Sequence, residues 1–196
     1  PYIPPKAPGV KKEVVVTHGP NGTAVNDWPT SMNLEMIANL NPTQDTNEWA
    51  FLPYDWTEDA KSHEIIPLSV IDRGKIQGQW LGEYLVSQQF EHVHLIAHSA
   101  GAWLIDEAAK KVKKYSPNTT IQMTFLDAFV PFSGDSLGAS ATWAEQYYVN
   151  DETGRFTEFH LPHAHNVDLS KIDPSFLNDH SFPYQWYGMT VTDGST

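Results

Sequence analysis

The chain of 196 residues contains no cysteine and few basic side chains. Without a thiol, cysteine nucleophiles, cysteine-ligated zinc and disulfide bonds are all excluded. The sequence has 12 lysine and arginine residues against 24 aspartate and glutamate residues, so its formal net charge is −12. Because proteins hold phosphate groups with Lys and Arg, this balance argues against nucleic acid or an anionic lipid surface as the partner. Long apolar runs are absent as well, and we expect no stable insertion into a membrane.

Length and composition predict a single soluble domain over residues 1–196. A chain of this size, with 40% hydrophobic residues, can bury a core without a disulfide or a structural metal. No repeat, low-complexity linker or charge block marks an internal boundary. The chain begins Pro-Tyr-Ile-Pro-Pro without an initiator Met, so we expect a processed or trimmed start. The sequence does not indicate an oligomeric state.

Short buried strands alternate with amphipathic helices along the chain. This pattern predicts an α/β fold with a mostly parallel sheet flanked by helices on both faces. The expected strands cover residues 13–17, 50–54, 92–97, 121–126, 146–149 and 156–161. Helices are expected at 65–86, where Gly74 and Gly78 weaken the middle, and at 101–114.

Ser99 lies between a predicted strand and a predicted helix, in the segment Ala97-His-Ser-Ala-Gly101. Small residues two before and two after a serine, at a sharp turn from strand to helix, are typical of a nucleophile elbow. Such a turn directs the helix N-terminus at the serine, so the Ala100 N–H would donate to an oxyanion formed there. The alternative is an ordinary strand-loop-helix connection in which Ser99 only caps the helix.

A serine nucleophile needs a base, and this elbow is accompanied by the chain order serine, acid, histidine. Four histidines follow Ser99, and we favour His180, which lies in a polar turn before an aromatic segment. The other three are His160, His163 and His165.

Asp127 is the preferred acid because it ends the predicted strand 121–126, at the edge where parallel sheets gather functional groups. Asp151 is the second candidate and Asp168 the third. The reading of Asp127 as a turn or capping carboxylate stays open.

The second oxyanion donor is expected in the loop His18-Gly19-Pro20-Asn21-Gly22-Thr23, which follows the first strand. Pro20 stands where the donor is expected, and proline has no N–H. The amide of Asn21 or Gly22, or a side chain of Asn21 or Thr23, would then take its place. We assign Asn21.

These motifs resemble the serine hydrolases of the α/β-hydrolase fold, in particular the pancreatic-lipase-like branch and its small bacterial lipase and esterase relatives. The resemblance runs from about Val14 to Tyr187. It rests on His18-Gly19 after a strand, Tyr54-Asp-Trp56, the elbow segment Val93 to Ala102, Phe125-Leu-Asp127, and Asp-His180 followed by aromatic residues. The sequence departs from that pattern at Ala97, where glycine is usual, at Ala100, where leucine is common, and at Pro20.

The resemblance implies a compact α/β-hydrolase fold and a carboxylic ester hydrolase that works through an acyl-enzyme. In that branch the acid follows the strand after the elbow strand, which favours Asp127 over Asp151. The resemblance also implies that no cofactor or metal is needed and that the protein is secreted by a bacterium. The substrate would be a small-molecule or polymeric ester.

Aromatic and imidazole side chains flank the predicted site segments and are expected to line a substrate pocket. They are His18, His98, Trp103, Phe129, Phe132 and Trp186. Between Asp127 and Tyr147 there are 19 residues, too few for a large helical lid. We therefore expect an open, shallow cleft that favours short or medium acyl esters, or accessible polymeric esters.

Two other functions remain open. His160, His163 and His165, with Asp168, could bind a divalent metal and make the protein a metal-dependent hydrolase, although a solvated loop explains them more simply. Pro20 at the expected donor position would also suit a catalytically silent hydrolase-fold domain that binds a ligand or partner.

Overall fold

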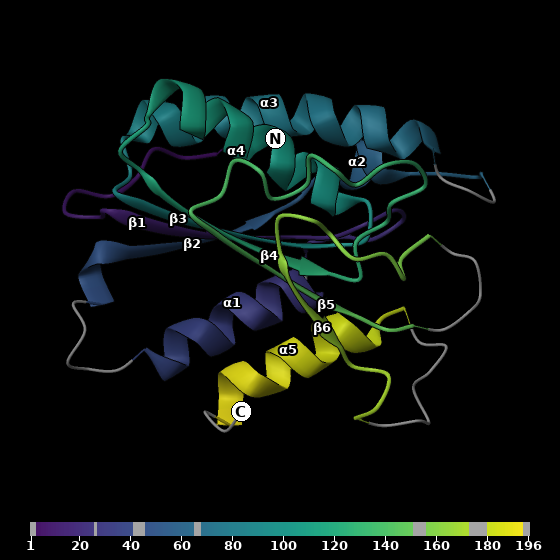
Figure 1. Ribbon diagram of the computed structural model, residues 1–196. Helices are drawn as coiled ribbons and strands as arrows, with labels where there is room; N and C mark the ends of the chain where they lie inside the picture. The colour runs from purple at the N-terminus through teal and green to yellow at the C-terminus, as the bar shows by residue number, and fades with distance from the viewer. Residues whose placement is uncertain are drawn as a thin grey trace.

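A computed structural model of the protein describes residues 3–25, 27–40, 46–64, 68–150, 156–172 and 180–193 (Figure 1). Its sheet has six strands in the order β2-β1-β3-β4-β5-β6, and every neighbouring pair is parallel. The strands are β1 (Lys12–Thr17), β2 (Trp49–Tyr54), β3 (His92–His98), β4 (Thr120–Leu126), β5 (Trp143–Tyr148) and β6 (His165–Asp168). The predicted fold class, a parallel α/β sheet flanked by helices, is confirmed.

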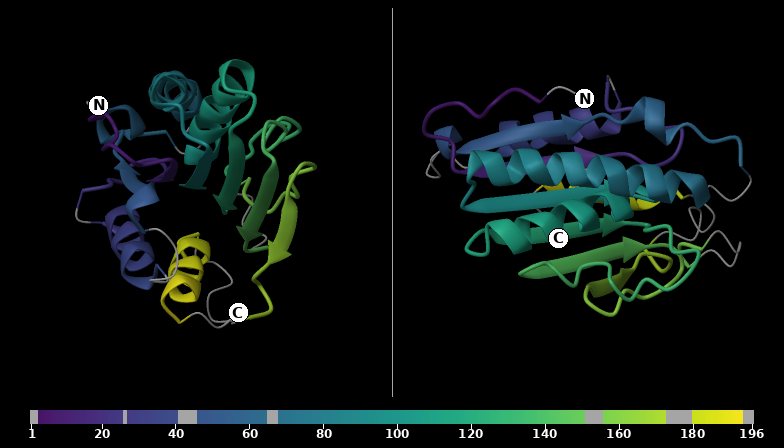
Figure 2. Two further views of the ribbon diagram at one scale, coloured as in Figure 1. Left: turned by 90° about the vertical axis from the view of Figure 1, so that its left-hand side faces the viewer. Right: turned by 90° about the horizontal axis from the view of Figure 1, so that it is seen from above.

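Two pairs of helices cover the two faces of the sheet (Figure 2). On one face lie α3 (Leu68–Gln88) and α4 (Gly101–Tyr115), and on the other lie α1 (Trp28–Asn39) and α5 (Phe182–Asp193). A 3-10 turn, η1 (Thr46–Glu48), precedes β2, and the short helix α2 (Thr57–Ala60) follows it. Within the described ranges, no helix is both long and apolar enough to cross a bilayer.

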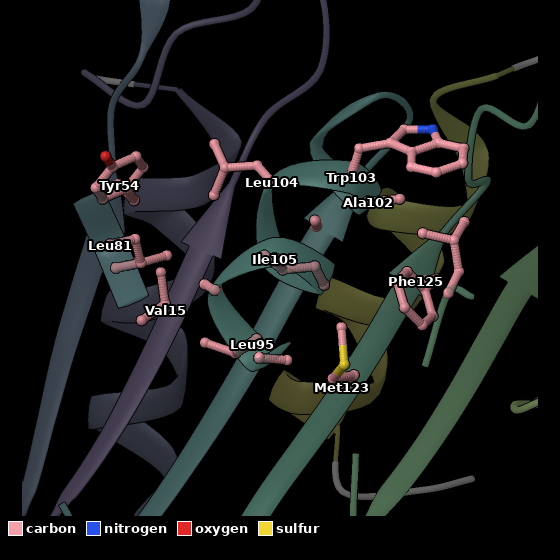
Figure 3. Close-up of a cluster of buried hydrophobic side chains, with 14 of the residues drawn as sticks. Val15, Tyr54, Leu81, Leu95, Ala102, Trp103, Leu104, Ile105, Met123 and Phe125 are labelled. Carbon is pink, nitrogen blue, oxygen red and sulfur yellow. The ribbon is translucent and has the colours of Figure 1, made fainter. Parts of the chain in front are cut away.

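The main core fills the space between the sheet and the pair α3 and α4 (Figure 3). Val15, Leu95 and Met123 contribute from three neighbouring strands, and Leu81 and Ile105 contribute from the two helices. All five are buried. The three strand residues share the face toward α3 and α4, because successive strand residues alternate between the two faces.

The helices α3 and α4 approach each other closely through a glycine. A Cβ placed on Gly78 would lie only 2.3 Å from the carbonyl oxygen of Leu104. Glycine lowers helix propensity in the middle of α3, but here it permits a helix contact that alanine would obstruct.

The expected strand at 156–161 is wrong, and the sixth strand is β6. Asn166 holds the residues from Leu161 to Ala164, directly before β6, in a turn. Its Oδ1 accepts from the Leu161 N–H at 2.9 Å, and its Nδ2 donates to Ala164 O at 2.8 Å. The Asn166 side chain thus pairs with backbone groups that would otherwise bond to a neighbouring strand.

Helices α1 and α5 were not expected from the sequence. The Asp27 side chain caps α1 by accepting from the Trp28 N–H at 2.7 Å, and Pro29 lies in the first turn, where its missing N–H costs nothing. Both helices have weak amphipathic patterns, so packing against each other and the sheet stabilises them more than periodicity does.

Candidate active site

Ser99 lies in the turn between β3 and α4, with a left-handed backbone at φ 56° and 4% of its surface exposed. Its N–H donates to Leu126 O on the neighbouring strand at 3.0 Å. A Cβ on Gly101 would meet His18 O at 2.7 Å and Ala97 Cβ at 3.4 Å. The small residues predicted around the serine are thus required by close packing of the turn against the loop after β1.

Ala100 is the N-cap residue of α4 and directly follows the serine. An N–H at this position has no intrahelical acceptor, and the positive end of the helix dipole adds to its pull on an anion. The Ala100 N–H, the expected first oxyanion donor, therefore lies at the helix N-terminus directly after the serine.

Asp127 and His180 form a close pair, with Asp127 Oδ2 and His180 Nδ1 2.6 Å apart. The other carboxylate oxygen, Oδ1, accepts from the Val149 N–H at 3.0 Å. Asp127 also has a left-handed backbone, with φ 51°, and its N–H donates to Tyr147 O at 2.8 Å. Asp127 is thus fixed at the carboxyl end of β4, next to the strand that leads to Ser99.

His98 also contacts His180. Its Nε2–H donates to the carbonyl oxygen of His180 at 2.8 Å, and the two imidazole rings lie 4.3 Å apart by centroid. Burial lowers the pKa of His98 to about 3, and the neighbouring His180 acts in the same direction. His98 is therefore a neutral donor at physiological pH, and it does not compete with His180 for a proton.

A second histidine-carboxylate pair is formed by His18, in the loop after β1, and Asp55, which follows β2. His18 is 1% exposed, its Nε2 is 3.2 Å from Asp55 Oδ1, and its carbonyl oxygen accepts from Trp56 Nε1–H at 2.9 Å. Asp55 Oδ1 also accepts from the Ala24 N–H at 3.1 Å.

Burial opposes ionisation of Asp55, but hydrogen bonds from Thr57, Ala24 and His18 outweigh it and hold the pKa of its carboxyl below the ordinary range. Asp55 has no role among the site residues predicted from the sequence. The only signal for it was the Tyr54-Asp-Trp56 motif, which ends a strand beside the site.

The structure does not support Asn21 as the second oxyanion donor. Its N–H donates to Ala60 O at 2.9 Å, and its side chain exchanges hydrogen bonds with the backbone of Ser62. The Gly22 N–H is used as well, donating to Gly19 O at 3.2 Å. The Asn21 bonds tie the loop to the end of α2 and the segment after it, so the backbone N–H and the side chain of Asn21 already have partners there.

A pocket of about 330 Å³ opens beside these groups. Its lining includes His18 and His98, as expected, and also His180. Trp28 and Tyr184, from the two unexpected helices, form part of the wall.

The four other aromatic residues expected in the pocket do not line it. Trp103 and Phe129 are buried in the core, where the Trp103 Nε1–H donates to Phe129 O at 2.8 Å. Phe132 is 69% exposed, and Trp186 packs on Tyr147 with a centroid distance of 5.1 Å. Sequence proximity to the site residues did not predict these directions, because Trp103 and Trp186 follow the faces of their helices and Phe129 and Phe132 lie in the irregular segment after β4.

The histidine-rich segment is engaged in other contacts. His160 Nε2 lies 2.8 Å from the Tyr148 hydroxyl, and the His165 ring stacks on Trp143. In the part of the chain that the structure describes, no group of three or more metal-ligating side chains comes together. Asp168 Oδ1 accepts from the Ser170 N–H at 2.9 Å, and Asp151 lies outside the described residues.

Among the solved structures that resemble this chain are two hydrolases. One is lipase B from Aspergillus fumigatus, with 12% identity and a TM-score of 0.45 over 83% of this chain and 45% of the lipase. The other is an extracellular α/β-hydrolase from a Paenibacillus species, with 11% identity and a TM-score of 0.47 over 91% and 97% of the two chains. No family model and no curated protein matches the sequence. The chain spans less than half of the fungal lipase.

Proposed function

We propose that the protein is a serine hydrolase of carboxylic esters, with Ser99 as nucleophile, His180 as base and Asp127 as the acid that orients the base. The observation that carries the proposal is the 2.6 Å contact between His180 Nδ1 and Asp127 Oδ2, beside a strained serine at a strand-to-helix turn. A serine hydroxyl is a weak nucleophile by itself. A histidine base whose imidazole is oriented by a carboxylate is the usual means of activating it.

In the proposed reaction, His180 Nε2 takes the proton of Ser99 Oγ as that oxygen bonds to the ester carbonyl carbon. The carbonyl oxygen becomes an oxyanion, which the Ala100 N–H and the N-terminus of α4 stabilise. The C–O bond to the alcohol then breaks, and His180 gives its proton to the leaving oxygen. Water, deprotonated by His180, hydrolyses the acyl-enzyme and restores Ser99.

The substrate class we propose is a small-molecule or accessible polymeric ester. The pocket of about 330 Å³ lies between the loop after β1 and the start of α5, and the described residues that line it include no lysine or arginine. A neutral ester suits this lining better than an anionic ligand, and the net charge of −12 favours release of the carboxylate product.

The decisive experiment combines covalent labelling with substitution. A fluorophosphonate probe should label the folded wild-type protein on Ser99, and Ser99→Ala should abolish labelling and lower kcat on p-nitrophenyl acetate by about 10⁶-fold, as in a protease triad. Ser133→Ala, which removes an exposed hydroxyl outside the pocket, should behave as wild type.

Other outcomes point elsewhere. Full ester hydrolysis by purified Ser99→Ala protein would overturn the proposal. If that activity were also lost on treatment with a chelator, the metal-dependent alternative would take its place. Folded wild-type protein that neither labels nor hydrolyses esters would indicate the silent binding domain.

A further inference from the structure

A groove of about 290 Å³ lies between helices α1 and α5, next to the proposed active-site pocket. Trp28 and Tyr184 line both hollows, and their rings stack at a centroid distance of 4.6 Å. Figure 2 shows α1 and α5 together on the sheet face opposite α3 and α4. The groove is thus a neighbour of the pocket with a common aromatic wall.

The chemistry of the groove favours an uncharged, apolar occupant. Met32, Met189 and Gly188 join the two aromatic rings in its lining. Among the described residues that line it, Glu35 is the only charged one, so an anionic ligand would be repelled. An alkyl chain would exchange water for methionine and aromatic surface, which is the exchange that drives apolar binding.

We propose that this groove is a subsite for an unbranched alkyl chain of the ester substrate. The inference rests on the proposed function, since it places the chain relative to the reacting carbonyl. Helix α5 begins at Phe182, two residues after His180, so one wall of the groove is tied to the base by a short piece of backbone. The alkyl chain belongs to either the acyl part or the alcohol part of the ester, and two series of substrates distinguish these two sources.

Gly188 offers a way to fill the groove without touching the proposed catalytic residues. A Cβ at this position would lie 3.7 Å from Glu35 Oε2 and 3.8 Å from Met32 Cε, which are ordinary contact distances. Gly188→Ala should therefore fit and leave the groove open. Gly188→Leu adds three further carbons that project into the space between the helices, and it should close the groove.

The kinetic test measures kcat/KM for p-nitrophenyl esters from acetate to decanoate and for n-alkyl acetates from ethyl to octyl. In wild type and Gly188→Ala, we expect kcat/KM to rise about fourfold for each methylene that enters the groove, in one of the two series. In Gly188→Leu this rise should flatten, while p-nitrophenyl acetate is hydrolysed within about twofold of wild type. An unchanged chain-length dependence in Gly188→Leu, or a flat profile in both wild-type series, would overturn the subsite.

A second measurement needs no activity and separates the two proposals. Titration of 1-octanol into ¹⁵N-labelled protein should shift the Trp28 indole N–H resonance in wild type and Gly188→Ala, and it should leave Gly188→Leu unaffected. An octanol shift without any ester hydrolysis would reject the esterase and keep the alkyl site. Ester hydrolysis without an octanol shift at Trp28 would keep the esterase and reject the alkyl site.

Discussion

Ser99, Asp127 and Asn21 all have a left-handed backbone, with φ of 56°, 51° and 55°. For residues with a Cβ this conformation costs about 1 kcal/mol each. The backbone amides of all three are fixed by hydrogen bonds to neighbouring segments, to Leu126 O, Tyr147 O and Ala60 O respectively. The surrounding fold therefore holds strain at the site that these residues would release in isolation.

The His98 contact leads to a test of a positioning residue. His98→Phe keeps a ring but removes the donor to His180 O, a bond worth about 1.4 kcal/mol, so kcat should fall about tenfold. Because His98 does not exchange a proton with the substrate in the proposed reaction, the pH profile should keep its shape. His98→Gln, which restores an N–H donor, should recover part of kcat.

The matched measurement is steady-state kinetics on a short ester, with the melting temperature as a check on folding. Wild-type kcat in His98→Phe would show that the hydrogen bond does not position the base. A loss that His98→Gln fails to recover, with a lowered melting temperature, would assign His98 to packing alone.

The close contact between α3 and α4 allows a prediction for helix packing. Gly78→Ala places a Cβ 2.3 Å from Leu104 O, so the helices must separate and stability should fall by about 2 kcal/mol. Gly74→Ala is the matched control in the same helix, because its Cβ comes no closer than 3.4 Å, to the outer ring atoms of Trp56. That variant should be neutral or gain up to about 1 kcal/mol from helix propensity.

Urea unfolding of both variants gives the comparison. Equal stability changes at the two positions would mean that propensity, and not the helix contact, decides the role of these glycines.

The elements differ in how far the sequence predicts them. The strands β1, β3 and β4 and the helix α4 could be placed to within about one residue, because short apolar segments mark the strands and a strong 3.6-residue pattern marks the helix. Helix α1 could not, since it exposes Leu34 and Ile37 and buries Pro29 and Asn33.

The candidate site also divides into residues that local patterns predict and residues that packing positions. Motif and chain order suffice to name Ser99, Asp127 and His180, whose catalytic roles stay a proposal. The pocket wall depends on Trp28 and Tyr184, and their positions follow from the packing of α1 on α5, which no local pattern encodes.

At the scale of the whole molecule, one buried carboxyl makes stability depend on pH. Glu13 is 2% exposed in β1, and burial raises the pKa of its carboxyl from 4.5 to about 8, with Lys6 acting weakly in the opposite direction. Between these two pH values the folded state binds more protons than the unfolded state. The contribution of Glu13 therefore favours folding least at high pH, and stability declines as the pH rises from about 4.5 to 8.

Glu13→Gln should remove this dependence. The variant keeps the shape of the side chain without a titrating proton, so it should gain on wild type by up to a few kcal/mol between pH 5 and pH 9. Chemical denaturation at pH 5, 7 and 9 measures the difference. Parallel pH curves for the two proteins would show that Glu13 is not protonated in the native state near neutral pH.

The backbone bonds of Ser99 and Asp127 extend the ladder of the parallel sheet into the site, from β3 to Leu126 O and from β4 to Tyr147 O. Amide protons in such central ladders exchange with solvent only when large parts of the molecule open. The proposed nucleophile and acid are thus expected in the slowest-exchanging part of the protein, whereas Trp28 and Tyr184 are carried by helices outside the ladder. Over evolutionary time, the two helices could be altered to accept other substrates while the geometry of the reacting groups is inherited unchanged.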